Sequence, residues 1–328
     1  MTARGRAGRT VWRDPRALCL LAATLLAAVA LFAPRVATRA TAYDLLAVVD
    51  VTGSMNVRDY ARGGRPVSRL DEVKAQLRAL AARLPCGSRL GLAIFTERRS
   101  FLLFEPVSTC ADFEPLDRAI AALDWRMAWE GDSYVASGLY SALALAAPLQ
   151  ADLAFFTDGQ EAPPLPASGR PPFPGELGAV RGLIVGVGGP TPAPIPKFDR
   201  DGREIGFYSA ADVPHENRHG LPPEGAAGRE GWHPRNAPWG ADAAAGEEHL
   251  SAVRTAYLSD LAAVTGLAYA PLGDAGTLLA ALETAARPRP VPAQRETAPL
   301  PAALALLLLA SLYAAPLLAP LRRAPRHS

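Results

Sequence analysis

Short apolar runs alternate with helical patterns through the middle of the chain. Residues 43–49 are apolar without strict alternation, which is typical of a strand buried on both faces. An apolar stripe with helical spacing follows Ser68, which can cap a helix that ends before residues 85–87 (Pro-Cys-Gly). The same reasoning predicts strands at 88–96, 100–107, 152–156, 182–187 and 267–271, and helices at 112–125, 134–147, 249–265 and 277–286. This order predicts an α/β fold with a doubly wound, mainly parallel sheet that is covered by helices on both faces.

Two segments interrupt this alternation. Residues 163–196 hold ten prolines, which indicates a loop. Residues 190–248 are rich in Pro, Gly and Ala and show neither a helical nor a strand period. The second segment, called the insertion below, is too long for a plain connector in a compact domain, and we expect it to serve a function, to be disordered, or both.

Both ends of the chain are apolar and basic. Residues 17–33 are uncharged and follow five arginines, and residues 298–321 are uncharged and precede three more. This predicts transmembrane helices at 17–33 and 299–320, cytoplasmic basic tails at 1–16 and 321–328, a linker at 287–298 and an exported domain at 43–286. An alternative for the first run is a signal peptide that is cut after Ala42, and it exports the middle of the chain equally.

The charge distribution agrees with this arrangement. The formal net charge is +2, but residues 1–33 carry a net +4, residues 299–328 a net +3 and the middle a net −5. A hydrophobic content of 49% excludes wholesale disorder, and the small net charge argues against a nucleic-acid-binding protein of ordinary basicity.

The cysteines also fit an exported domain. Cys19 lies in the first apolar run, whereas Cys86 and Cys110 flank the two strands predicted on either side of residues 97–99. In a hairpin that turns there, Cys86 and Cys110 face each other at the open end. Because oxidising compartments favour pairing, we expect a Cys86–Cys110 disulfide rather than two free buried thiols.

Candidate metal ligands stand at strand ends. Residues 50–54 have the pattern D-x-T-x-S, with one carboxylate (Asp50) and two hydroxyls (Thr52 and Ser54) at alternate positions. Asp158 ends a later strand, and Ser133 precedes a helix. Because parallel sheets bind ligands at the carboxyl ends of their strands, we expect these oxygens to converge on a hard cation such as Mg²⁺.

This pattern, together with the order of strands and helices over residues 43–286, resembles the von Willebrand factor A (VWA) family. That family's metal-ion-dependent adhesion site (MIDAS) has D-x-S-x-S, a later Thr and a later Asp. The resemblance implies a site formed by Asp50, Thr52, Ser54, Ser133 and Asp158, with Thr at 52 and Ser at 133 as departures that keep a hydroxyl. It implies Mg²⁺, or Ca²⁺ or Mn²⁺, which binds an acidic side chain of a protein partner and does no catalysis.

The resemblance extends to membrane-anchored VWA proteins that are encoded beside MoxR-type ATPases. Residues 48–69 and the Arg98-Arg99 turn are similar to VWA accessory proteins of bacterial methanol dehydrogenase systems. This implies a role in maturation of a periplasmic enzyme, including metal insertion, with the dehydrogenase or another VWA membrane protein as partner. The alternative is a Bat-like envelope stress (aerotolerance) protein with the same domain.

The insertion suggests two further hypotheses. His215, Glu216 and His219 match the H-E-x-x-H pattern of zinc hydrolases, but Pro214 and residues 220–223 leave little room for the helix that this motif requires. We therefore expect that the protein is not an enzyme. The alternative is a metal hydrolase that uses these three residues. Because the insertion leaves the 182–187 strand at its carboxyl end, we also expect it to overhang the metal site and restrict the choice of partner.

Overall fold

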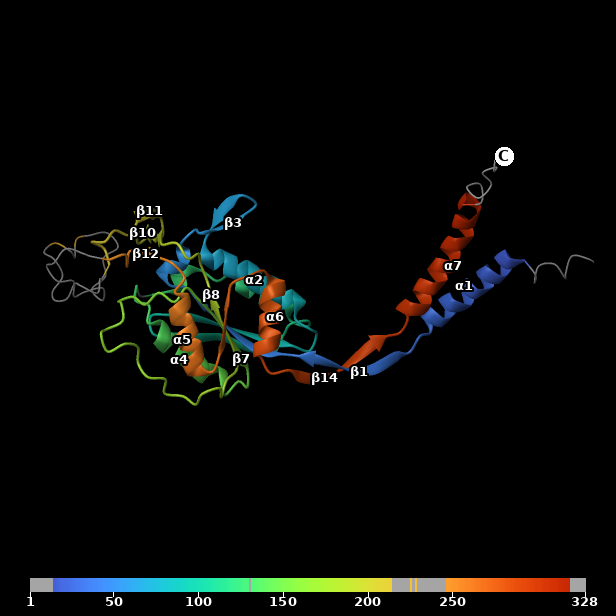
Figure 1. Cartoon of the computed structure of the whole chain (residues 1–328), viewed down its shortest axis with the longest axis horizontal. Coiled ribbons are helices and arrows are strands. Elements are labelled where there is room, and N and C mark those ends of the chain that lie inside the picture. Colours follow the sequence, from blue (N-terminus) through green and yellow to red (C-terminus); the bar gives the residue numbers. More distant parts are fainter. Residues whose placement is uncertain (1–13, 130, 214–224, 226–227, 229–245, 319–328) are drawn as a thin grey trace, which may run out of the picture. The chain divides into compact units, whose positions relative to one another are not determined.

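The computed structural model describes residues 14–129, 131–213, 225, 228 and 246–318, which form two compact units. The larger unit, Thr41–Pro290 (Figure 1), is built on a six-stranded sheet with the strand order β13-β8-β7-β2-β5-β6. These strands are β2 (Asp44–Asp50), β5 (Arg89–Thr96), β6 (Arg99–Ser108), β7 (Asp152–Thr157), β8 (Gly182–Gly186) and β13 (Ala268–Pro271). All neighbouring pairs are parallel except β5 and β6, so the sheet is mixed, and the predicted α/β fold is confirmed.

Helices cover both faces of this sheet, as predicted. Their bounds are α2 (Arg69–Arg83), α3 (Phe113–Ala121), α4 (Val135–Ala146), α5 (Thr255–Thr265) and α6 (Ala275–Ala285). Short 3-10 helices η2 (Gly53–Asn56) and η3 (Trp125–Met127) and a hairpin of β3 (Tyr60–Arg62) and β4 (Arg65–Val67) complete this part of the chain. Ser68 caps α2 by accepting a hydrogen bond from the Asp71 backbone N–H (3.1 Å), as its sequence predicts.

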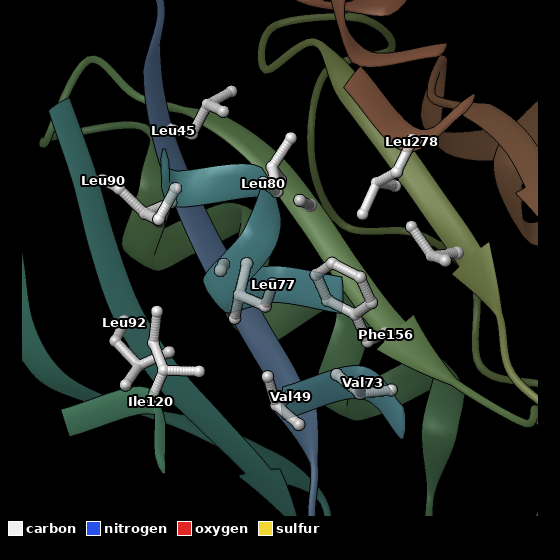
Figure 2. Close-up of a cluster of buried hydrophobic side chains, with 14 of the residues drawn as sticks. Leu45, Val49, Val73, Leu77, Leu80, Leu90, Leu92, Ile120, Phe156 and Leu278 are labelled. Atoms are coloured by element: carbon white, nitrogen blue, oxygen red, sulfur yellow. The ribbon is translucent and has the colours of Figure 1, made fainter. Parts of the chain in front are cut away.

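Two apolar cores lie on opposite faces of the sheet. On one face, α2, α3 and α6 pack their leucines and isoleucines against the odd-numbered residues of β2, including Leu45 and Val49 (Figure 2). On the other face, α4 and α5 pack against the even-numbered residues Leu46 and Val48. This double burial explains why β2 lacks the polar alternation of a half-exposed strand.

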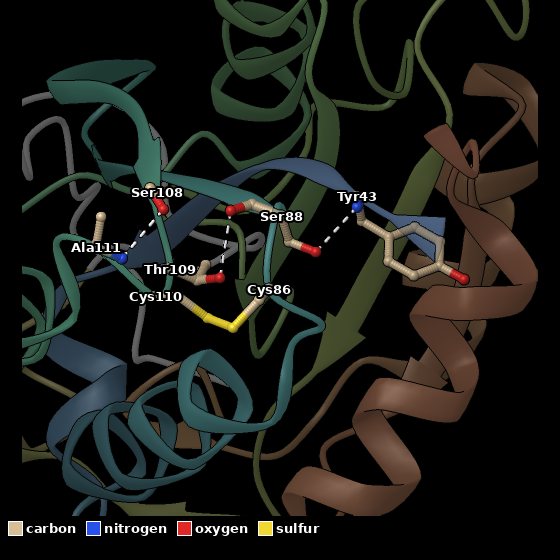
Figure 3. The surroundings of a disulfide bond; sticks show 7 residues. All are labelled: Tyr43, Cys86, Ser88, Ser108, Thr109, Cys110 and Ala111. Carbon is tan, nitrogen blue, oxygen red and sulfur yellow. Dashed lines mark hydrogen bonds between the residues drawn. A yellow bond between two sulfur atoms is a disulfide. The ribbon is translucent and has the colours of Figure 1, made fainter. Parts of the chain in front are cut away.

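The β5–β6 hairpin carries the predicted disulfide. Ile94 pairs with Phe101 near the turn, and two irregularities in register shift the pairing to Arg89 with Ser108 at the open end. There Cys86 and Cys110 are bonded, with their Cα atoms 5.5 Å apart (Figure 3). The predicted disulfide is present, and it closes the hairpin at its open end.

The described parts of the insertion contain short strands, which the sequence analysis did not predict. They are β9 (Ala193–Pro194), β10 (Pro196–Phe198) and β11 (Glu204–Phe207), and β12 (Leu250–Ser251) follows the insertion. β10 pairs with β11 and β9 pairs with β12, both antiparallel. The helix predicted to begin at residue 249 begins instead at Thr255, because residues 250–251 pair with β9.

The second unit comprises residues 1–40 and 291–328, and its helices α1 (Pro15–Leu31) and α7 (Pro299–Leu318) lie side by side (Figure 1). Strands β1 (Arg35–Ala42) and β14 (Arg289–Glu296), most of whose residues belong to this unit, pair with each other, so the segment expected to be a linker at 287–298 contains a strand. Within the described residues, no helix combines the length and the apolarity needed to cross a membrane. The transmembrane helices expected at 17–33 and 299–320 are therefore not supported.

Candidate metal site at the sheet edge

The candidate site lies at a topological switch point of the sheet, where the strands that follow β2 in the chain are placed first on one side of it and then on the other. β2 has β5 on one side and β7 on the other, and the polypeptide leaves β2 and β7 at the same edge of the sheet. Asp50 is the last residue of β2, and Asp158 directly follows β7. Such switch points are the usual ligand-binding positions of open α/β sheets, because neighbouring loops diverge there.

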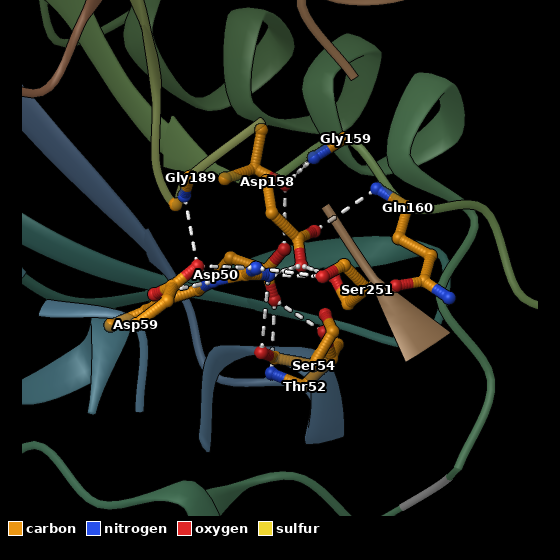
Figure 4. A network of polar contacts seen from close by, with 12 residues as sticks. Asp50, Thr52, Ser54, Asp59, Asp158, Gly159, Gln160, Gly189 and Ser251 are labelled. Atoms are coloured by element: carbon orange, nitrogen blue, oxygen red, sulfur yellow. Dashed lines mark hydrogen bonds and ion pairs between the residues drawn. The ribbon is translucent and has the colours of Figure 1, made fainter. Parts of the chain in front are cut away.

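Asp50 is fully buried and held by three hydrogen bonds (Figure 4). Its Oδ1 accepts from the backbone N–H (2.9 Å) and the Oγ1 hydroxyl (2.7 Å) of Thr52, and its Oδ2 accepts from the Thr157 hydroxyl (2.7 Å). Burial, followed by the charge of Asp158, raises the pKa of Asp50 to about 7, although the hydrogen bonds from Thr157 and Thr52 favour the ionised form. A cation beside this carboxylate would stabilise its ionised form.

The two serines of the predicted site hold hydroxyls that no group in the described part of the chain satisfies. Ser54 is 7% exposed and Ser133 is 3% exposed, and neither Oγ has a hydrogen-bond partner among the described residues. The position of Ser133 is fixed through its backbone, which exchanges two hydrogen bonds with Ala162 (2.6 and 2.8 Å). Buried polar groups are rarely left unpaired, so these two hydroxyls point to a missing ligand.

Asp158 is also fully buried, but its oxygens already have protein partners. Its Oδ2 accepts hydrogen bonds from Arg69 Nη1 (2.8 Å) and the Ser251 hydroxyl (2.9 Å), and its Oδ1 accepts from the backbone N–H of Gln160 (3.0 Å). The structure thus brings all five predicted residues to one edge of the sheet. It distinguishes Asp158, which is ion-paired, from the unpaired hydroxyls of Ser54 and Ser133.

Arg69 contacts the candidate site through Asp158, and the sequence analysis did not identify it. Its side chain is 0% exposed and also binds Asp59, whose Oδ2 lies 2.7 Å from Arg69 Nη2. The charges of Asp158 and Asp59 raise the pKa of Arg69 against the opposing effect of its burial. The available signal was its register, since Arg69 precedes the buried Val73 and Leu77 of α2 by four and eight residues.

A pocket of about 200 Å³ lies at the candidate site. Its lining includes Thr52, Ser54 and Ser133. Ile195, Phe198 and other residues of the insertion also line it. The described part of the insertion therefore overhangs the candidate site, as its point of departure from β8 suggested.

The oxygen donors suit a hard divalent cation better than zinc. In the described parts of the chain, no group of three or more His, Cys, Asp or Glu side chains is arranged to hold a metal. The candidate site instead combines one carboxylate, Asp50, with neutral hydroxyls, and Mg²⁺ is commonly coordinated by such oxygens. The alternative hydrolase residues His215, Glu216 and His219 lie outside the described residues.

The match to one protein family agrees with this fold. Residues 45–160 match the von Willebrand factor type A domain family. No curated protein matches the chain. An aerotolerance-related membrane protein from Bacteroides fragilis is similar at 15% identity over 74% of this chain and 97% of its own, with a TM-score of 0.45. The protein BatB from Bacteroides thetaiotaomicron is similar at 14% identity over 73% of this chain and 94% of its own, with a TM-score of 0.44.

The structural similarities are too distant to bear on function, whereas the family match covers four of the six strands of the sheet (β2, β5, β6 and β7) and all five predicted site residues. It includes Asp50, Thr52, Ser54, Ser133 and Asp158. The mixed α/β sheet that contains residues 45–160 therefore has the fold of a von Willebrand factor type A domain.

Proposed function

We propose that the chain binds a protein partner through a divalent cation held by Asp50, Ser54 and Ser133. The observation that carries this proposal is the pair of buried serine hydroxyls that lack a partner within the described structure and line the same pocket. Thr52 supports Asp50 by hydrogen bonding, and Asp158 contributes negative charge nearby while remaining paired with Arg69. The proposed ion is Mg²⁺, with Ca²⁺ or Mn²⁺ as substitutes. It would offer a coordination position to a carboxylate of the partner.

The charge balance favours adhesion over catalysis. Asp50 contributes one negative charge to the ion, and the two serines are neutral. Because Arg69 already neutralises much of the charge of Asp158, a divalent ion there retains net positive charge. An acidic side chain of a partner is the natural remaining ligand, and we propose that the chain is not an enzyme.

We further propose that the domain acts in the bacterial cell envelope, attached to the inner membrane by its terminal segments. A disulfide is typical of oxidising compartments, and large apolar side chains such as Leu25 (59% exposed) and Leu306 (68% exposed) cover the surface of α1 and α7. The role favoured by the sequence is maturation of a periplasmic enzyme such as methanol dehydrogenase, including metal insertion. A Bat-like envelope stress protein is the alternative, and genes neighbouring this one separate the two.

A metal titration and a capture experiment test the binding proposal. The wild type, Asp50→Asn and Ser133→Ala are titrated with MgCl₂ in a calorimeter, with Ser137→Ala, on the first turn of α4, as the matched control. We expect Asp50→Asn and Ser133→Ala to lose at least about tenfold in Mg²⁺ affinity, because the first removes the negative charge of a ligand and the second removes a hydroxyl ligand, and we expect the control to keep it.

The same four proteins are then used to capture partners from an envelope extract in MgCl₂ and in EDTA. A partner that the wild type retains only in MgCl₂, and that Asp50→Asn does not retain, supports the proposal. Equal retention by all four proteins in both buffers contradicts it.

A further inference from the structure

The pocket at the candidate site has aromatic and apolar side chains in its lining. Trp125 and Phe198 stack in its wall, with ring centroids 4.3 Å apart and planes inclined by 24°. Ile195 and Tyr208 add apolar surface from the insertion. The pocket therefore offers a bulky apolar group a place to bury beside the hydroxyls of Ser54 and Ser133.

The charged groups of this wall are all acidic. Glu161, Asp199 and Glu248 line the pocket, and its described lining contains no Lys, Arg or His. Glu161 accepts hydrogen bonds from the backbone N–H groups of Val135 and Ala136 (both 2.9 Å) and from the Tyr257 hydroxyl, and Asp199 is paired with Arg203 (3.7 Å). Even with Arg203 counted, acidic groups outnumber basic ones here, so a partner that carried several carboxylates would be disfavoured and basic residues on either side of a single carboxylate would be favoured.

Gln160 adds a specific hydrogen-bonding position. Its Nε2 donates to the carbonyls of Glu248 (3.0 Å) and Leu250 (3.1 Å), and this pair of bonds fixes the orientation of the amide. Its Oε1 is buried and accepts no hydrogen bond from the part of the chain that is described. A backbone N–H of an extended polypeptide would satisfy this acceptor.

The size of the pocket favours side chains over a free small molecule. Its volume of about 200 Å³ lies below the roughly 300–1,000 Å³ of typical small-molecule sites. One or two residues of a polypeptide fit this space.

We propose that the pocket selects a partner segment with one carboxylate next to a bulky apolar residue and with basic residues on both sides. The inference rests on the metal-dependent binding proposed above. In this arrangement the carboxylate reaches the ion at Asp50, Ser54 and Ser133, and the apolar side chain packs on Trp125 and Phe198. The basic flanks face the carboxylates of the wall.

Three fluorescent probe peptides, blocked at both ends, test this selection by anisotropy in MgCl₂ and in EDTA. They carry the cores Lys-Phe-Asp-Lys, Lys-Gly-Asp-Lys and Glu-Phe-Asp-Glu. We expect the first to bind in MgCl₂ at least about tenfold more tightly than the second, since a filled apolar pocket discriminates to that degree. We expect it to bind up to about fivefold more tightly than the third.

Two variants locate the effect. Phe198→Ala should remove most of the preference for the phenylalanine peptide while leaving the Mg²⁺ requirement intact. Phe207→Ala, in the same β10–β11 hairpin, should leave both unchanged, because Phe207 is 53% exposed and does not line the pocket.

The outcomes separate the two proposals. Mg²⁺-dependent binding with equal affinity for the first two peptides, or an unchanged preference in Phe198→Ala, overturns the selectivity and leaves metal-dependent binding intact. If no peptide shows binding that depends on Mg²⁺, both the selectivity and the proposed function are overturned.

Discussion

Replacing Arg69 by methionine would leave two carboxylates without their cation. Arg69 Nη1 lies 2.8 Å from Asp158 Oδ2 and 2.6 Å from the Ser251 hydroxyl, and Arg69 Nη2 lies 2.7 Å from Asp59 Oδ2. Methionine preserves an apolar stem of similar length and donates no hydrogen bond. Asp158 is 0% exposed, so water cannot replace the lost guanidinium without opening the structure.

The expected cost is large compared with the stability of a typical domain. Breaking a buried ion pair by removing one partner costs about 3–5 kcal/mol, because the other charge stays buried and uncompensated. Since domains are commonly stable by roughly 5–15 kcal/mol, Arg69→Met should lose about a fifth or more of the free energy of unfolding.

Urea unfolding followed by circular dichroism measures this loss, and the same helix provides a matched control. Arg78 also forms two hydrogen bonds to one carboxylate, that of Asp117, at 2.6 and 2.7 Å. The side chains of that pair are 46% and 22% exposed. Arg78→Met should therefore cost less than about 1 kcal/mol.

The double variant Arg69→Met/Asp158→Asn completes the test. Because the asparagine carries no charge, it should recover part of the loss and show a coupling of at least about 1 kcal/mol. The reasoning is refuted if Arg69→Met destabilises the protein no more than Arg78→Met does, or if the effects of Arg69→Met and Asp158→Asn simply add.

Three further predictions concern stability. Burial raises the pKa of Asp44, but the hydrogen bonds and charges of Arg89 and Arg289 outweigh this effect and lower the pKa from 3.8. Ionised Asp44 therefore stabilises the fold above pH 3.8, and this contribution is lost as the pH falls through the pKa that Asp44 has in the folded protein. The difference in unfolding free energy between the wild type and Asp44→Asn should thus be constant near neutral pH and shrink below pH 3.8. Replacing Cys86 and Cys110 by serine should cost about 3–4 kcal/mol, measured by urea unfolding, because the bond closes a loop with a sequence separation of 24. Gly138→Ala should lower the melting temperature by an amount equivalent to about 1–3 kcal/mol, because the added Cβ would lie 2.1 Å from the ring of Phe95.

Each of these has a contrary outcome. A difference between Asp44→Asn and the wild type that grows below pH 3.8 would reverse the assigned sign. Equal urea midpoints for the oxidised protein and the serine variant would mean that the loop is constrained without the disulfide. A Gly138→Ala protein as stable as Ser137→Ala, one residue away on α4, would show that the Phe95 ring moves aside at no cost.

Local chemistry explains what the sequence predicted well. The cap at Ser68 and the unbroken apolar run of β2 depend on neighbouring residues, so their patterns are visible without a structure. The pairing of Cys86 with Cys110 followed from a short hairpin, although irregularities in register within β5 and β6 changed the pairing along it. The convergence of Asp50 and Asp158 followed from the rule that parallel strands end at one edge.

Features set by distant contacts were predicted less well. β9 has two residues and pairs with β12, more than fifty residues later, so neither strand has a period that the sequence could show. β14 was not predicted for the same reason, because its partner strand β1 lies near the other end of the chain. Arg69 was missed because an arginine at the start of a helix is usually exposed, and its burial depends on Asp59 and Asp158.

The network around Arg69 also explains how a long insertion can be accommodated beside the site. Directly before the insertion, the Gly189 N–H donates to Asp59 Oδ2 (2.8 Å), and shortly after the insertion the Ser251 carbonyl accepts from Arg69 Nη2 (3.0 Å). Gly188 must be glycine in this arrangement, because its φ is +108° and an added Cβ would lie 2.6 Å from Arg69 Nε. The side chain of Arg69, which orients Asp158, therefore also helps to fix where the insertion leaves the sheet and where it returns. Changes within the insertion can then alter the pocket wall without displacing the carboxylate of Asp158.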